Sequence, residues 1–95
     1  MKPLEARPVR DRLVYVEWED ARGVTSEWTD VQTLAKADTC VCVSIGVLLA
    51  KDRQRIVILP HYMGDDPYGG CGEMVIPRSQ VRRMWALRIG REMRG

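Results

Sequence analysis

The sequence contains no phenylalanine, one histidine and three cysteines among its 95 residues. Without phenylalanine, a core must be built from aliphatic side chains, methionine and the three tryptophans. An odd number of cysteines favours free thiols in a reducing compartment over a disulfide framework. No apolar run approaches the length of a membrane span. The first residues carry charge and proline but no apolar core of a signal peptide, so we expect a cytoplasmic protein.

The length and composition predict a single small folded domain. A chain of 95 residues forms one domain at most, and a hydrophobic content of 45% excludes wholesale disorder. We expect a flexible N-terminal arm over residues 1–11, one domain over residues 12–90 and a basic tail over residues 91–95. A core of this size is marginal, and assembly into a homo-oligomer would add buried area.

Hydrophobic patterning predicts an all-β fold. Five apolar segments with strand character follow one another, without a helix long enough for a crossover connection. They are residues 13–18, 39–50, 55–62, 74–76 and 81 to about 89. Because sequential strands usually pair, we expect an antiparallel meander that closes as a five-stranded SH3-like or Sm-like barrel. Gly46 lies inside the longest strand and predicts a bend that lets this strand serve both halves of the barrel.

The only helical pattern is short. Trp28, Val31 and Leu34 recur at the spacing of one helical turn, with Asp30 as a weak N-terminal cap. We expect this turn to pack over one end of the barrel.

Charge is distributed unevenly along the chain, although the formal net charge is only +2. Acids outnumber bases between Arg12 and Asp38, whereas the segment from Arg78 onward holds six arginines and a single acid, Glu92. Such asymmetry is typical of a basic patch for an anionic partner, or of head-to-tail contact between subunits. It is equally consistent with an edge strand kept soluble by charge.

The predicted ligand-binding residues lie in this basic segment. Guanidinium groups bind phosphates with paired hydrogen bonds, and an exposed tryptophan can stack on a base. The candidates are Arg78, Arg82, Arg83, Trp85 and Arg88. On a regularly alternating strand, Arg83 and Trp85 share one face while Arg82 and Arg88 lie on the other, so they do not line one groove in a single subunit. Trp85 is alternatively a core or interface aromatic.

Metal and catalytic sites have weaker support. Cys40, Cys42, His61 and Cys71 are the only set worth weighing for zinc, but a Cys-x-Cys pair on a flat strand is not a zinc knuckle. Cys71, His61 and Asp65 or Asp66 contain the residue types of a nucleophilic site, although nothing in their spacing requires one. We therefore predict no metal, no cofactor and no enzymatic activity.

Several stretches resemble known families. Residues 16–21, Trp28 with Leu34, residues 43–46 and residues 71–77 resemble a family of small uncharacterised proteins from tailed-bacteriophage genomes. The resemblance covers most of the chain after the N-terminal arm, and it implies a phage or prophage origin and a location in the host cytoplasm. Residues 74–87 are separately similar to the closing strands of Sm-like proteins, a resemblance that implies ring assembly and RNA binding.

Together these observations predict a non-enzymatic phage accessory protein that self-associates and binds an anionic partner, nucleic acid, through its C-terminal arginines. One alternative is a counter-defence protein that captures a small nucleotide signal between subunits. Another is a structural or adaptor protein that binds a host or virion protein through the acidic face around residues 17–30.

Overall fold

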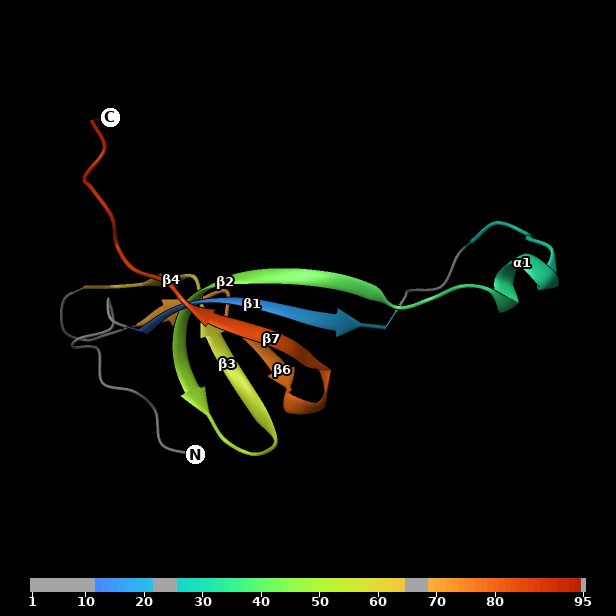
Figure 1. The fold of residues 1–95 in the computed structure, drawn as a ribbon, viewed down its shortest axis with the longest axis horizontal. Coiled ribbons are helices and arrows are strands. Elements are labelled where there is room, and N and C mark those ends of the chain that lie inside the picture. The colour runs from blue at the N-terminus through green and yellow to red at the C-terminus, as the bar shows by residue number, and fades with distance from the viewer. Residues whose placement is uncertain (1–11, 22–25, 65–68, 95) are drawn as a thin grey trace.

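The computed structural model describes residues 12–21, 26–64 and 69–94. Its main feature is a five-stranded antiparallel sheet with the strand order β6-β3-β2-β1-β7, which confirms the predicted all-β class (Figure 1). The strands of this sheet are β1 (Leu13–Asp20), β2 (Cys40–Lys51), β3 (Arg55–Leu59), β6 (Met74–Pro77) and β7 (Val81–Ala86). The remaining elements are α1 (Val31–Ala35), β4 (His61–Tyr62), β5 (Gly70–Cys71) and the 3-10 turn η2 (Arg78–Gln80).

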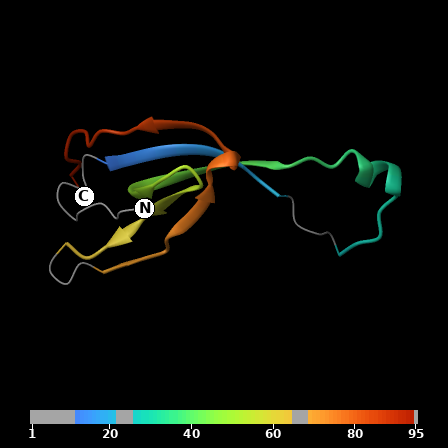
Figure 2. The ribbon, with the colours of Figure 1, turned by 90° about the horizontal axis from the view of Figure 1, so that it is seen from below.

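The sheet is not closed, in contrast to the barrel that the sequence predicts. The two edge strands, β6 and β7, follow each other in the chain through η2, yet no hydrogen-bonded pairing joins them within the described residues. β6 has only four residues and ends at Pro77, which has no N–H to donate to a further strand. The final strand also stops at Ala86, three residues short of the expected end. The result is a curved but open sheet (Figure 2).

β2 holds the two halves of the sheet together, as its length and internal glycine predict. It pairs with β1 from Cys40 to Val47 and with β3 from Val47 to Lys51. Gly46 lies where the two pairings meet, and a Cβ atom there would approach the Leu59 carbonyl oxygen and Ile58 Cγ2 to 2.8 Å. A side chain at position 46 would therefore separate β2 from β3.

The main core lies on one face of the sheet. Its buried residues come from β1, β3 and β6, and they are Val14, Val16, Trp18, Ile56, Ile58 and Ile76. The small residues of β2 leave room for the Trp18 ring, whose Nε1 donates a hydrogen bond of 3.0 Å to Ser44 Oγ. Val47 and Leu59 form a second cluster with Leu13 and Leu49.

The segment that carries α1 stands away from the sheet (Figures 1 and 2). Asp30 caps α1 by accepting a hydrogen bond of 3.1 Å from the Thr33 N–H, but no residue of the helix is buried. The expectation that this turn packs over the sheet is therefore wrong. A five-residue helix has too little apolar surface to hold itself against the sheet at the end of a long connection. The radius of gyration, 17.2 Å, exceeds the roughly 13 Å of a compact domain of this size.

The segment after β3 leaves the main sheet at Pro60, as its proline predicts. β4 and β5 then pair as a separate two-stranded hairpin, with His61 opposite Cys71. Gly72 follows with a positive φ of 78°. The described residues include no helix of the length and apolarity needed to traverse a membrane. The predicted arm, residues 1–11, lies outside the described residues.

Candidate functional site

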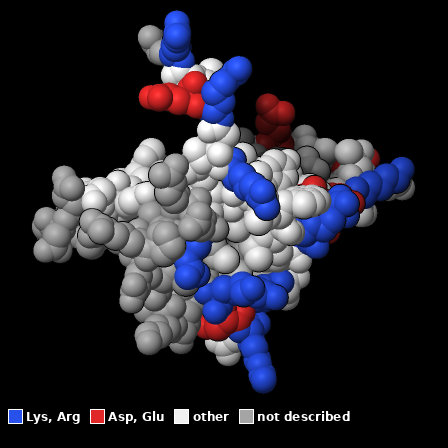
Figure 3. Space-filling view, turned by 60° about the vertical axis from the view of Figure 1, so that its left-hand side comes forward, with Lys and Arg blue, Asp and Glu red and all other residues white. Residues whose placement is uncertain are grey.

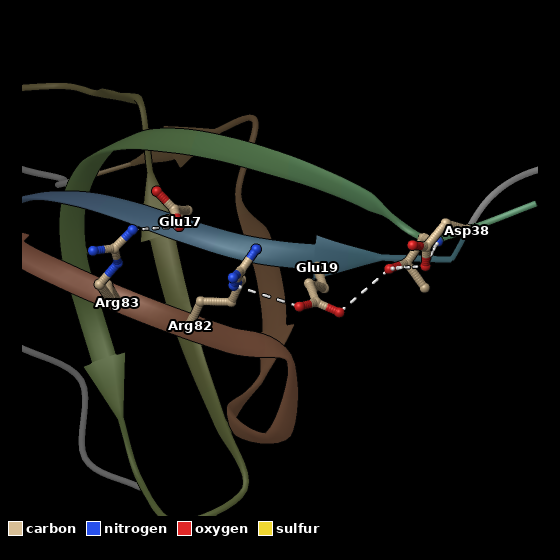
Figure 4. A network of polar contacts seen from close by, with 6 residues as sticks. Glu17, Glu19, Asp38, Arg82 and Arg83 are labelled. Atoms are coloured by element: carbon tan, nitrogen blue, oxygen red, sulfur yellow. Dashed lines mark hydrogen bonds and ion pairs between the residues drawn. The ribbon is translucent and has the colours of Figure 1, made fainter.

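The acidic and basic regions of the sequence meet on neighbouring strands. β7 pairs with β1, and this pairing brings two arginines against two glutamates (Figure 4). Arg83 Nη2 lies 3.3 Å from Glu17 Oε1, and Arg82 Nε lies 3.4 Å from Glu19 Oε1. Glu19 also accepts a hydrogen bond of 3.3 Å from Thr39 Oγ1. Part of the charge asymmetry is therefore neutralised within one chain.

A β-bulge explains why two consecutive arginines reach the same row of acids. The register shifts so that Glu17 is opposite Arg83 while Trp18 is opposite Val81, which leaves Arg82 as the extra residue. A bulge interrupts the alternation of side chains, so both arginines pair with glutamates of β1 instead of lying on opposite faces. The expectation of regular alternation at Arg82 and Arg83 is wrong. The glutamates at positions 17 and 19 indicate a cross-strand pairing with arginine, but not the bulge that brings Arg82 into it.

Trp85 lies beside Arg83 on the same strand. Its ring meets the ring of Tyr15 edge-on, with 5.4 Å between centroids and an angle of 73° between planes. The Arg83 guanidinium carbon lies 5.4 Å from the Trp85 ring centroid, a cation–π contact. Trp85 is nonetheless 43% exposed, so part of the ring faces solvent beside a positive charge.

The other two predicted ligand-binding residues lie apart from this group. Arg78 begins η2, and its Nη1 donates a hydrogen bond of 3.5 Å to the Asp52 carbonyl in the β2–β3 turn. Arg88 follows the end of β7 and is exposed. Figure 3 shows lysine and arginine side chains at several separate places on the surface, some of them beside acids. The structure therefore brings Arg82, Arg83 and Trp85 together but does not gather all five residues.

The four residues weighed as a zinc site do not converge either. Cys40 and Cys42 lie at the outer end of β2, whereas His61 and Cys71 face each other in the β4–β5 hairpin. Within the described residues, no three His, Cys, Asp or Glu side chains form a group that could hold a metal ion. A shallow pocket of about 370 Å³ lies at the hairpin, lined by residues that include His61, Tyr62 and Cys71. Asp65 and Asp66, the orienting groups of the catalytic alternative, lie outside the described residues.

The most unusual surface is apolar, and the sequence interpretation missed it. Val41, Val43 and Ile45, which we call the β2 stripe, share one face of β2 and are 48–56% exposed. Trp28, just before α1, and Val31 and Leu34 of the helix, which we call the arm tip, are exposed as well. The exposed fraction of Trp28 is 102% and that of Val31 is 74%. Both apolar patterns are visible in the sequence, but a closed barrel with α1 docked on it would have covered them.

Comparison with known proteins gave no match. No protein-family model matches the chain, and neither the curated proteins nor the solved structures include a significant match. The resemblance to phage proteins and to Sm-like barrels therefore stays a prediction.

Proposed function

We propose that this protein is a non-enzymatic binding protein that works by self-association. The observation that carries this proposal is the exposed apolar surface of the arm tip and the β2 stripe. Exposed patches of large apolar side chains usually mark a protein–protein contact. A fully exposed tryptophan is especially costly in water, because burying a large apolar side chain is worth about 1.5 to 3 kcal/mol. A partner that covers this surface would recover that free energy.

Charge favours a second copy of the chain as the partner. Residues 26–39, around the arm tip, hold three acids against one lysine, a net charge of −2. Residues 87–94, which follow β7, hold three arginines against one acid, a net charge of +2. The arm of one copy and the C-terminal segment of another are therefore electrostatically complementary. The adaptor alternative loses support, because Glu17 and Glu19 of the acidic face are already paired with arginines.

Sedimentation velocity over a range of protein concentrations tests this proposal. We expect the wild-type chain to form oligomers, and the double variant Trp28→Ser with Leu34→Ser to need at least about tenfold more protein for assembly. Gln32→Ser is the matched control, since it changes an exposed polar residue of the same helix. A wild-type chain that stays monomeric at all concentrations would refute the proposal.

Binding of an anionic partner is a second candidate, and the unpaired arginines favour it. Among the described residues, the ion pairs engage Arg82 and Arg83 but none of Arg78, Arg88, Arg91 and Arg94. These arginines can bind phosphates without first giving up a carboxylate partner.

Fluorescence anisotropy with a labelled single-stranded oligonucleotide tests the second candidate. We expect weak binding that falls steeply between about 50 and 200 mM salt, as release of counterions requires. Arg88→Ala with Arg91→Ala should weaken binding more than the control pair Arg82→Ala with Arg83→Ala, whose side chains are held by glutamates. If both pairs of substitutions weaken binding equally, the unpaired arginines are not the binding site. Absence of binding at low salt would exclude nucleic acid as the partner.

A further inference from the structure

The outer half of β2 has a hydrogen-bonding edge that no strand of the described chain occupies. β1 pairs with β2 along Cys40 to Val47, but β3 begins to pair with it only at Val47. On the side away from β1, the segment from Cys40 to Gly46, here called the open edge, therefore has no neighbouring strand among the described residues. Exposed N–H and C=O groups in such a row are a template for a further strand.

The open edge lacks the features that normally protect an exposed strand. Natural edges carry charged side chains or proline that prevent pairing with another chain. Residues 40–46 contain neither a charged residue nor a proline, and three of them, Val41, Val43 and Ile45, are apolar and β-branched. The two ends of the sheet differ from this pattern, because β7 presents Arg82 and Arg83 and β6 ends at Pro77. The open edge is the stretch of the sheet best suited to pairing.

We infer that the open edge of β2 pairs antiparallel with the same edge of a second copy, which gives a two-fold symmetric dimer. The inference rests on the proposed self-association and names its interface. In a two-fold contact both copies use the same surface: a residue that meets a second residue on the partner is matched by the reciprocal pair. An uncharged strand tolerates such self-pairing, whereas a strand with arginines would place like charges opposite each other.

Antiparallel pairing also brings the arm tip of each copy close to the partner. β2 begins at Cys40, directly after the segment that carries α1, and this end of the strand projects away from the body of the sheet (Figure 1). When two copies pair in opposite directions, the projecting end of each strand lies beside the middle of the other. The arm beyond it then runs along the body of the partner. The arm tip of each copy would then lie against the partner, and the two β2 stripes would lie next to each other on one face of the paired strands.

The area available is sufficient for a stable dimer. Trp28 alone presents on the order of 200 Å², and Val31, Leu34 and the backbone of the open edge add to it on each copy. Counted over both copies and the surfaces that they cover, this exceeds the roughly 1,000 Å² expected of a biological interface.

The same substitution on two strands tests the inference. Val43 is the middle residue of the open edge. When residues 40–46 of two copies pair antiparallel, Val43→Lys therefore places two positive charges opposite each other. Val75→Lys is the matched control, since Val75 is 55% exposed on the edge strand β6, compared with 48% for Val43. We expect Val43→Lys to raise the dissociation constant of the dimer by on the order of 100-fold, and Val75→Lys to change it by less than about threefold. Circular dichroism would verify that both variants fold.

Hydrogen exchange of the wild-type chain gives a second readout that needs no variant. In the dimer, alternate amides of residues 40–46 should become at least about tenfold better protected as the protein concentration rises. If oligomers form while these amides stay unprotected, or if the two lysine variants assemble equally well, the interface lies elsewhere and the inference fails while the proposed function stands. If the wild-type chain is monomeric throughout, both fail.

Discussion

At the scale of single residues, Gly46 decides how β2 passes between its two partners. Its backbone lies so close to β3 that a methyl group would meet the Leu59 carbonyl oxygen at 2.8 Å. The contact is with backbone, which cannot rotate away as a flexible side chain can. We expect Gly46→Ala to lower the free energy of unfolding by about 2 to 3 kcal/mol, because β2 and β3 must separate to admit the new atom.

Urea denaturation at one fixed protein concentration would measure this loss, since dissociation of an oligomer would otherwise contribute to the apparent stability. Gly90→Ala is the matched control, because a Cβ atom at position 90 meets nothing within 4 Å. The control should change stability by less than about 0.5 kcal/mol. Equal effects at both positions would show that the close approach at Gly46 is not the constraint described above.

The arginines show what the sequence could not predict at this scale. The clusters of opposite charge were visible, and cross-strand pairing of Arg83 with Glu17 follows once β1 and β7 are neighbours. The bulge that adds Arg82 to the same group has no signature in the sequence, because it depends on the register of the two strands. Reversing both arginines to glutamate would place four acids together. Neutral substitutions are therefore the better probe of ligand binding.

At the scale of elements, the β2–β3 turn is organised by one carboxylate. Asp52 Oδ1 accepts hydrogen bonds from the backbone N–H groups of Gln54 at 2.8 Å and Arg55 at 2.9 Å. The bond from Gln54 and, to a smaller extent, the bond from Arg55 lower the pKa of Asp52 below its ordinary value of 3.8. Because the folded state favours the ionised form, the stabilisation is fully present above about pH 4 and is lost as the pH falls through the lowered pKa.

Asp52→Asn tests this account, because asparagine keeps the shape of the side chain but carries no charge. We expect the wild-type chain to melt at a higher temperature than the variant at neutral pH. The difference should shrink as the pH falls below about 4, where Asp52 of the wild type becomes protonated. Thermal unfolding followed by circular dichroism from pH 7 to pH 2 gives both curves. A difference that does not vary with pH would contradict the assigned role of the charge.

The sequence predicts the type of an element well where the signal lies within one segment of the chain. The strand character of β1, β2 and β3, the turn after Lys51 and the short helix at Val31 all follow from spacing, β-branched residues and turn residues. The positions of the elements relative to one another were predicted less well. Neither the open gap between β6 and β7 nor the separation of α1 from the sheet is encoded in one segment, because both depend on packing between distant parts of the chain.

At the scale of the whole molecule, the fold leaves an unusual amount of apolar surface uncovered for a chain of 95 residues. Among residues 12–21, 26–64 and 69–94, the two buried clusters comprise eight residues, whereas the arm tip and the β2 stripe place six large apolar side chains in solvent. A core this small contributes little stability alone. Assembly explains the exposed surface and the small core together, and the opposite charges of the arm and the C-terminal segment favour assembly with a second copy.

Native mass spectrometry of the wild-type chain over a range of micromolar concentrations tests this central claim most directly. The account predicts a dimer of twice the chain mass of 10.9 kDa, in equilibrium with monomer at the lowest concentrations. A chain that remains monomeric over the whole range, with its apolar surface uncovered, would contradict the account.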